Sequence, residues 1–383
     1  MSARASRFGA LACVGALATT ACSAPVVKAT ARAWPDADKL FRGDARFLGA
    51  DSAYSAPLPG GRVLWMFGDT FVAKGVPSGV VATRHDAVMV HNSVAVQTGL
   101  DPSSAQIAHF FGGTVDAPAS FFADDGERYT WPGTPALVDG KLLLFLWTIA
   151  KSDGGLGFAF LGARALLVDN PGDDPPAWHT TALSVPAAAS TGGFALGTGG
   201  TLVDGDALYL LAAREPGDHQ MALARVSVQD AARGDLSHIV WLADDGAFLS
   251  LDSAHGASTP RALFAGQTEL SLTHTGGAFE VVGVDGFGAV PVVMRSSARI
   301  DGPWSAAGAI YAPPEATRAT KGAIVYSAKA HPELRANGAN GANGSDASEL
   351  IVTYCSNSTD LATVVNDDTL YFPRFLRVSL EKR

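Results

Sequence analysis

The sequence predicts an all-β protein, and three observations support this fold class. The chain of 383 residues contains 42 Gly and 21 Pro, the residues that favour turns, and only 17% of its residues are charged. Short apolar runs rich in Val, Leu and Phe alternate with these turns. No long stretch shows a helical period with capping residues at both ends. A fold built from many short strands follows from this pattern.

The first candidate hairpin lies within Gly49–Phe71, GADSAYSAPLPGGRVLWMFGDTF. Its first strand, Arg46 to Leu58, carries the small and polar residues that a strand lining a crowded channel needs. Pro59-Gly60-Gly61 supplies the turn, because Gly tolerates a positive φ and Pro cannot continue the ladder. The second strand, Arg62 to Phe67, is the continuous apolar run of a strand that is buried on both faces.

This unit of polar-tolerant strand, Gly-containing turn and apolar strand occurs about five times, at spacings of roughly 65–80 residues. The later copies are TPALVDGKLLLFLWTI, GTLVDGDALYLLAARE, ELSLTHTGGAFEVVGVD, and YSAKAHPEL followed by SELIVTYCSNS. Outer strands are expected at Ser93–Gln97, Ala163–Leu167, Ala222–Ser227, Val290–Ser296 and Phe375–Leu380. Sheets packed around an axis explain the repeat. We expect a five-bladed β-propeller with four-stranded antiparallel blades around a central channel, and a pair of packed sheets is the alternative.

The N-terminus, residues 1–22, has the pattern of a signal peptide. Two arginines precede an apolar segment, Phe8–Ala21, which is too short to remain as a membrane-spanning helix. The segment ends at Cys22 in a sequence that is similar to a bacterial lipobox. We expect a secreted or cell-envelope protein, with a lipid on Cys22 as its membrane attachment or with simple cleavage near Ala21 or Ala24.

The remaining chain divides into a tether at 23–41 and a propeller at 42–383. The low-complexity run ANGANGANG at 336–344 has nothing to bury and is expected to be a disordered insertion. Cys355 is the one cysteine left beyond Cys22, so no disulfide is expected within the mature chain.

The charge balance bears on the partner. With 28 basic and 37 acidic residues the formal net charge is −9, and no basic stripe is present to neutralise phosphates. A nucleic-acid partner is therefore not expected. The sequence also has no Gly-x-Ser-x-Gly elbow, no phosphate-binding loop and no Cys-x-x-Cys pair, and we expect no cofactor.

Three carboxylates are the candidate catalytic residues. Asp51 in the first strand and Asp69 directly after the second interrupt an apolar setting, and Glu269 begins the fourth repeat. Glycoside hydrolysis needs two carboxyl groups, one protonated and one ionised, and burial beside like charge separates their pKa values. We expect Asp51 to be the base or nucleophile, with Asp69 and Glu269 as acid or pKa modulator. Alternatively, Asp69 caps a turn and Glu269 is a solvated edge residue.

Six further residues are candidates for substrate binding. Arg84-His85-Asp86 and His91-Asn92-Ser93 form a polar cluster, but the spacing of His85 and His91 fits no standard metal template, so no metal is expected. Aromatic rings beside polar or Gly-Pro sequence can stack on sugars, although aromatics in β-rich chains are more often core. His331 can equally be a packed turn histidine. The binding candidates are Tyr54, His91, Asn92, Trp131, His274 and His331.

These segments also carry a family resemblance. GADSAYSAPLPGGRVLWMFGDTF, HNSVAV, YTWPGTPALVDGKLLLFLW, TELSL, and YSAKAHPEL with SELIVTYCSNS and YFPRFLRV resemble the family called domain of unknown function 4185. The resemblance covers roughly Arg42 to Arg377 and implies a secreted five-bladed propeller. It also implies a glycoside hydrolase, since some members are endo-acting D-arabinofuranases that cut bacterial arabinan. Asp51 and Asp69 match the acidic positions of the first blade, and Glu269 matches less well. A polysaccharide is thus the expected substrate, and a non-catalytic glycan-binding or envelope-scaffolding propeller is the alternative.

Overall fold

The computed structural model describes residues 27–75, 82–154, 157–186, 193–250, 259–317, 322–336 and 349–381. Nearly all of the regular structure in these ranges is strand, so the all-β prediction is confirmed. The predicted signal peptide with Cys22, and residues 337–344 of the predicted insertion, lie outside the described residues.

Five antiparallel sheets form the body of the molecule, and each has an inner strand near the centre and further strands that follow it outward. From the inner strand outward, the first sheet contains β3 (Tyr54–Leu58), β4 (Arg62–Phe67), β7 (Ser93–Thr98) and β8 (Gln106–Phe110), and the second contains β11 (Arg128–Val138), β12 (Lys141–Lys151), β13 (Phe158–Val168) and β14 (Thr180–Leu183). The third sheet contains β16 (Thr201–Asp204), β17 (Ala207–Arg214), β18 (Gln220–Ser227) and β19 (Val240–Leu242), and the fourth contains β22 (Ser271–Thr275), β23 (Ala278–Val284), β24 (Val292–Ser297) and β25 (Gly308–Tyr311). The fifth sheet contains β26 (Ala323–Ala330), β27 (Glu349–Ser358), β28 (Arg374–Glu381) and β1 (Lys28–Ala33).

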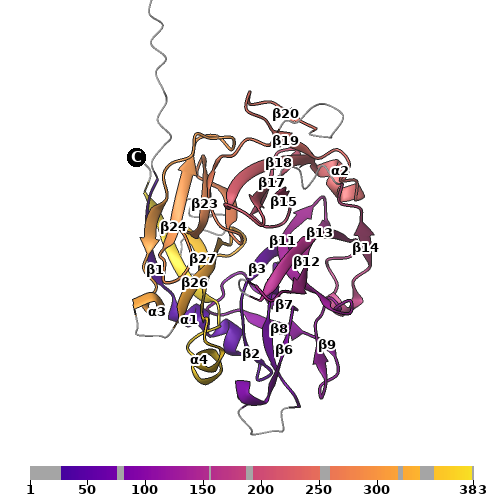
Figure 1. Cartoon of the computed structure of the whole chain (residues 1–383), viewed down its shortest axis with the longest axis vertical. Coiled ribbons are helices and arrows are strands. Elements are labelled where there is room, and N and C mark those ends of the chain that lie inside the picture. The colour runs from indigo at the N-terminus through magenta and orange to yellow at the C-terminus, as the bar shows by residue number, and fades with distance from the viewer. Residues whose placement is uncertain are drawn as a thin grey trace, which may run out of the picture.

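The five repeats seen in the sequence are the first two strands of these sheets, and each predicted outer strand falls on the third strand of a sheet. The inner strands lie side by side in the order β3, β11, β16, β22 and β26 around the centre of Figure 1. Hydrogen bonds link the last of them back to the first, since the Tyr326 hydroxyl donates to Asp51 and the Ser327 hydroxyl donates to the Ser52 carbonyl.

Short strands extend this body at its edges. The third sheet also carries β15 (Phe194–Ala195), β20 (Phe248–Leu249) and β21 (Phe264–Ala265). A separate sheet of β2 (Phe47–Ala50), β5 (Thr70–Ala73) and β6 (Ala87–Val90) lies beside the first sheet, together with a small pair, β9 (Gly112–Gly113) and β10 (Pro118–Ala119).

The prediction of one strand from Arg46 to Leu58 was wrong. The chain forms β2 and β3 in different sheets, with Asp51, Ser52 and Ala53 between them. Ser52 and Ala53 have φ values of 64° and 49°, in the left-handed region, which ends a strand because it turns the backbone away from the ladder.

The tether predicted at 23–41 is also wrong from Lys28 onward. β1 pairs with β28 over six residues, from Lys28 opposite Glu381 to Ala33 opposite Leu376. The helices α1 (Pro35–Asp38) and η1 (Leu40–Arg42) follow, and Phe41 is fully buried against Trp65 and Phe375. The N-terminal segment is thus the outer strand of the fifth sheet and part of the core.

The other helices are short: η2 (Arg84–Asp86), η3 (Pro175–Ala177), α2 (Val228–Arg233), α3 (Pro314–Thr317) and α4 (Leu361–Asn366). In the part of the chain that is described, no helix is long and apolar enough to cross a membrane. The core lies between neighbouring sheets, where apolar residues of β4, β12, β17, β23 and β27 pack on both faces, as the apolar runs in the sequence predicted.

Candidate functional site

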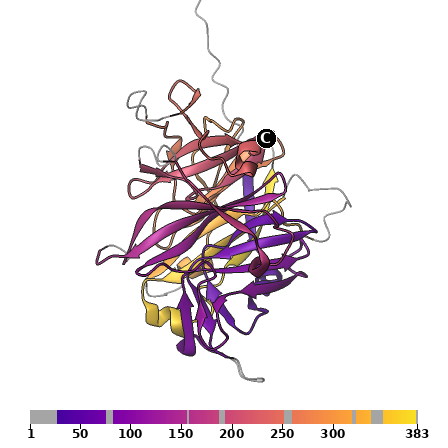
Figure 2. The same cartoon turned by 90° about the vertical axis from the view of Figure 1, so that its right-hand side faces the viewer.

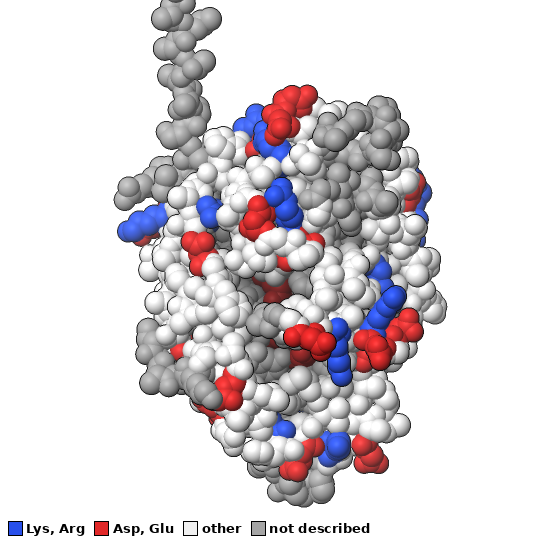
Figure 3. Space-filling view, viewed as in Figure 1, with Lys and Arg blue, Asp and Glu red and all other residues white. Residues whose placement is uncertain are grey.

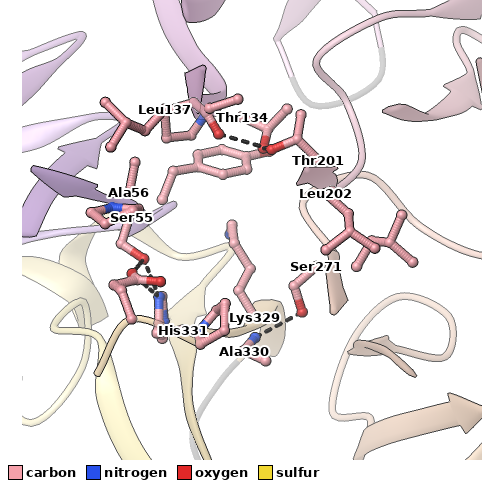
Figure 4. A pocket seen from close by; sticks show the side chains of 18 of the residues that line it. Ser55, Ala56, Thr134, Leu137, Thr201, Leu202, Ser271, Lys329, Ala330 and His331 are labelled. Carbon is pink, nitrogen blue, oxygen red and sulfur yellow. Dashed lines mark hydrogen bonds and ion pairs between the residues drawn. The ribbon is translucent and has the colours of Figure 1, made fainter. Parts of the chain in front are cut away.

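A cavity of about 240 Å³ lies among the five inner strands. Ser55, Thr134, Thr201, Ser271 and Lys329, one from each inner strand or its flank, surround it in Figure 4. The inner strands therefore keep the small polar residues that the sequence analysis expected of channel-lining strands. In Figure 3 this face of the molecule is hollowed near its middle, and acidic surface is visible inside the hollow.

Asp51 lies directly before the inner strand β3, in the left-handed turn that follows β2. Its Oδ2 accepts hydrogen bonds from the hydroxyls of Tyr326 at 2.7 Å and Tyr371 at 3.2 Å. Burial, and then the charges of Asp69 and Glu269, raise the pKa of Asp51 well above its ordinary value, and the two phenols oppose the rise. This carboxyl group therefore holds its proton more tightly than an exposed aspartate does.

Asp69 lies between β4 and β5, where the chain passes from the first sheet to the small sheet beside it. The preceding residue, Gly68, lies close to Asp51. If Gly68 had a Cβ, that atom would be 2.4 Å from the Asp51 Oδ1. The Trp131 indole N–H donates to the Asp69 Oδ1 at 2.8 Å. Burial raises the pKa of Asp69 to about 6, although the Trp131 hydrogen bond and the His91 ring oppose the rise.

Glu269 lies two residues before β22, and its amide N–H donates to the Thr198 carbonyl at 2.7 Å. Its carboxylate is 3.9 Å from the Nζ of Lys329, a buried lysine on β26. Lys329 also donates to the Ser52 carbonyl at 2.6 Å and lies 4.2 Å above the Tyr54 ring. Burial lowers the pKa of Lys329, and the Glu269 carboxylate opposes this. The three carboxyl groups, which we call the acidic cluster, thus come from three separate loops, and the buried Lys329 ammonium group is paired with one of them, Glu269.

The backbone of this site is strained. Among the described residues, seven residues other than Gly have a positive φ. Five of them belong to this cluster: Ser52, Ala53, Glu269, Ser327 and Tyr371. Left-handed backbone in residues with a side chain costs free energy and persists only where surrounding bonds impose it, and it is concentrated at active sites. Here the Ser327 hydroxyl and Lys329 both bond the Ser52 carbonyl and hold the two segments together.

Arg84, placed by sequence in a polar recognition cluster, is instead a buried structural residue. Its guanidinium donates to four backbone carbonyls, those of Leu48, Val364, Asp367 and Leu370, at 2.6–3.0 Å. These bonds fix the segment that ends at Tyr371, so Arg84 supports Asp51 from a distance and does not face a substrate.

Asn92 and His331, two predicted binding residues, are buried with their polar atoms bonded inside the protein. Asn92 is fully buried, donates to the carbonyls of Phe122 and Thr130, and accepts from the Phe122 amide. The two ring nitrogens of His331 bond Ser55 at 2.5 Å and Thr353 at 2.7 Å, and burial lowers its pKa to about 3. The polar atoms of these two side chains are thus already hydrogen-bonded within the protein, and His331 also lines the cavity among the inner strands.

Tyr54 and His274 are two further predicted binding residues. Tyr54 is only 2% exposed, packs between the first two sheets beneath Lys329, and lines the cavity among the inner strands. His274 is exposed, near the hairpin end of β22, and stacks on Phe279. That end of the strand is opposite to the end where Glu269 lies, so His274 does not join the acidic cluster.

His91 and Trp131 do lie at the cluster. His91 is paired with Asp124 at 2.9 Å, stacks on Tyr129 at 4.1 Å, and is about one-third exposed. Trp131 is partly exposed and bonded to Asp69. Both side chains therefore border Asp69 on the side of the second sheet.

Within the acidic cluster, Lys329 is paired with Glu269. Within the described ranges, one group of side chains has the spacing to hold a cation: Asp230, Asp235 and His238 near α2. It is not part of the acidic cluster, and its Asp230 is ion-paired with Arg233.

Sequence reasoning missed several residues of the site: Gly68, Ser327, Lys329, Tyr326 and Tyr371. Lys329 could have been predicted from the sequence, because a lysine in an otherwise uncharged inner strand must be paired when it is buried. The role of Tyr371 could not have been predicted, since 320 residues of sequence separate it from Asp51.

A solved structure has the same fold as this chain. A candidate hydrolase from Bacteroides ovatus ATCC 8483 superimposes with a TM-score of 0.68 at 17% identity, over 91% of this chain and 90% of that one. At this identity the similarity shows the fold alone. An α-L-arabinofuranosidase from Lactobacillus brevis has a TM-score of 0.45 at 14% identity, over 88% of this chain and 92% of its own. An exo-β-1,3-galactanase from Phanerochaete chrysosporium has a TM-score of 0.45 at 11% identity, over 92% and 63%.

No curated protein matches the sequence. A family model does match, over residues 36–380, and it is not the model of domain of unknown function 4185, which the sequence motifs resemble. The match covers almost all of the described residues, including every member of the acidic cluster. The chain therefore belongs to the family described as domain of unknown function DUF5005.

Proposed function

We propose that the protein is a glycoside hydrolase that cleaves a neutral polysaccharide of the cell envelope or its surroundings by acid–base catalysis. One observation carries this proposal: Asp51, Asp69 and Glu269 converge from three loops, and Asp51 and Asp69 have raised pKa values. Hydrolysis of a glycosidic bond needs one carboxyl group that is protonated and one that is ionised near neutral pH.

The fold that suits this activity is a five-bladed β-propeller, with the five sheets as its blades. The cyclic order of the inner strands supports this, and two packed sheets would not place five inner strands around one cavity. In such a fold the loops before the inner strands meet at one mouth, and Asp51 and Glu269 both lie in loops of this kind.

We assign the proton to Asp51 and the ionised role to Asp69, the reverse of the sequence expectation for Asp51. Asp51 has the like charges of Asp69 and Glu269 beside it, so it keeps its proton to a higher pH. Asp69 accepts the Trp131 N–H and has a pKa of about 6, so it is mainly ionised at neutral pH. Glu269, beside Lys329, raises the pKa of Asp51. The narrower proposal, an endo-acting D-arabinofuranase, rests on the motif resemblance alone.

The test is hydrolysis of a panel of neutral polysaccharides that includes arabinogalactan, with detection of released oligosaccharides. Asp51→Asn and Asp69→Asn are each expected to lower the rate by about 100-fold or more, the usual effect of removing an acid or base. Asp51→Asn should retain more activity on aryl glycosides with good leaving groups, which need no proton. His274→Ala, at the other end of its strand, is the control. If the unaltered protein binds glycans but does not hydrolyse them, the proposal is wrong and a non-catalytic binding module is favoured.

A further inference from the structure

The second sheet extends past its neighbours on the side of the acidic cluster. β11, β12 and β13 each have 11 residues, about 35 Å of strand, whereas the neighbouring inner strands β3 and β16 have five and four. The residues of β11 from Pro135 to Leu137 line the cavity, so the extra length lies on the other side, where Trp131 reaches Asp69. In Figure 2 the magenta strands of this sheet project from the body.

One face of this extension is aromatic. The strand register places Trp131 opposite Trp147, and Tyr129 and Phe160 opposite Ile149, so these side chains share a face. Phe158 joins them edge-on, with 4.6 Å between its ring centre and that of Trp131, and Phe160 lies edge-on to Trp147 at 6.2 Å. Trp131 of β11 and Phe158 and Phe160 of β13 are partly exposed and pack on the buried rings beneath them. We call these three rings the β13 platform.

The rings of this face are joined at two points to the loops that carry the carboxylates. The Trp131 indole donates to Asp69. The Trp147 indole, beneath the platform, donates to the Gly197 carbonyl at 3.0 Å, and the next residue, Thr198, accepts the Glu269 amide. The aromatic face therefore runs between two of the acidic loops and is continuous with the site.

The border of the platform is polar. His91, hydrogen-bonded to Asp124, stacks on Tyr129 next to Trp131. Apolar rings with a few polar groups at their edge suit a ligand with apolar C–H faces and hydroxyl edges, which is the chemistry of a sugar ring. The carboxylates of Asp69 and Asp124, at the Trp131 end of the platform, repel the anionic groups of uronic acids and sulfated sugars, whereas Lys151, opposite Phe158, lies at its other end.

We propose that the β13 platform is a subsite that binds a second sugar ring of a neutral glycan, next to the ring held at the carboxylates. The inference rests on the proposed function and deepens it. The substrate is then a chain of at least two sugars, and part of its affinity comes from outside the reacting residue.

The experiment measures binding apart from catalysis. Neutral oligosaccharides from two to six sugars, their monosaccharides and a polyuronate are titrated by calorimetry into the full chain carrying Asp51→Asn. Adding Phe158→Ala with Phe160→Ala should weaken oligosaccharide binding about tenfold, the scale of one aromatic contact, and leave monosaccharide binding unchanged. Leu161→Ala is the matched control, since Leu161 is the neighbouring residue in the β13 bulge and is 51% exposed. Phe158→Leu keeps the apolar volume without the ring and serves if the double variant does not fold.

The outcomes separate the two proposals. Equal weakening for monosaccharides and oligosaccharides, or no weakening while the unaltered enzyme hydrolyses the glycan, overturns the platform and leaves the hydrolase standing. Tighter binding of the polyuronate than of the neutral chains also overturns the platform. If the unaltered chain neither hydrolyses nor binds any glycan, the proposed function fails and the subsite fails with it.

Discussion

At the residue scale, the site depends on how closely the backbone of Gly68 approaches Asp51. The Asp51 carbonyl accepts the Gly68 amide at 3.3 Å, and the Asp51 carboxylate lies against the Gly68 Cα. The φ of Gly68 is not in the left-handed region, so the need for glycine at this position is one of space and not of backbone conformation. The Gly before Asp69 thus serves a different purpose from the Gly residues of the turns.

Replacing Gly68 by Ala should therefore lower activity without unfolding the protein. The new Cβ would lie 2.4 Å from the Asp51 Oδ1 and 2.9 Å from the Ser52 Oγ, so the carboxyl group must turn away from Tyr326 and Tyr371. We expect a fall in kcat/KM of at least about tenfold, since misplacement by about 1 Å has large effects on rate. Gly172→Ala, at a site where a Cβ meets nothing within 4 Å, is the control. Equal activity in the two variants would contradict this account.

At the scale of the elements, the fifth sheet depends on a strand from the other end of the chain. β1 covers β28, and its partly buried Ala29 and Ala31 pack on the apolar cluster between the fourth and fifth sheets. Without β1 the edge of β28 would expose unpaired backbone groups next to an apolar face, which favours aggregation.

A chain that starts at residue 34 should consequently be less stable than one that starts at Lys28. We expect its Tm to fall by about 5 °C or more, the change produced by a loss of a few kcal/mol in a chain of this size. Its unfolding should be accompanied by aggregation. Thermal unfolding with light scattering measures both quantities. If the two chains melt alike, β1 contributes no stability and its pairing is incidental.

The elements themselves were largely predictable from sequence, whereas the site was only partly so. The apolar runs of β4, β12, β17, β23 and β27 are buried on both faces, and such continuous apolar runs can be recognised in the sequence alone. The break at Ser52 and Ala53 was not predictable, because neither residue favours the left-handed region and distant bonds from Ser327 and Lys329 impose it. The internal hydrogen bonds of Asn92 and His331 were not predictable for a similar reason, since only tertiary structure shows which polar atoms are already bonded.

For the whole molecule, the acidic cluster makes folding stability depend on pH. The pKa of Asp69 is raised in the folded state, from 3.8 to about 6. The folded state therefore holds a proton that the unfolded state releases, and stability falls as the pH rises from about 4 to about 6. The cost of keeping an ionised Asp69 is fully present above that range, and a pKa rise of this size corresponds to at most about 3 kcal/mol.

We therefore expect Asp69→Asn to be more stable than the unaltered protein at pH 7.5 and to lose most of this advantage at pH 4.5. Denaturant unfolding of both proteins at the two pH values gives the comparison. The asparagine can still accept the Trp131 N–H, so the difference reports on charge. A stability gap that is the same at both pH values would show that packing, and not ionisation, is responsible.

The pairing of β1 with β28 also determines when this protein can finish folding. Lys28 lies opposite Glu381, so β1 finds its neighbour only after the roughly 350 residues between them have been synthesised. The four earlier sheets are built from segments closer together in sequence and can form in turn, while the fifth must bring β1 and β28 together across this long separation. Until that step β28 has an open edge, and so the pairing of β1 with β28 completes the fold last.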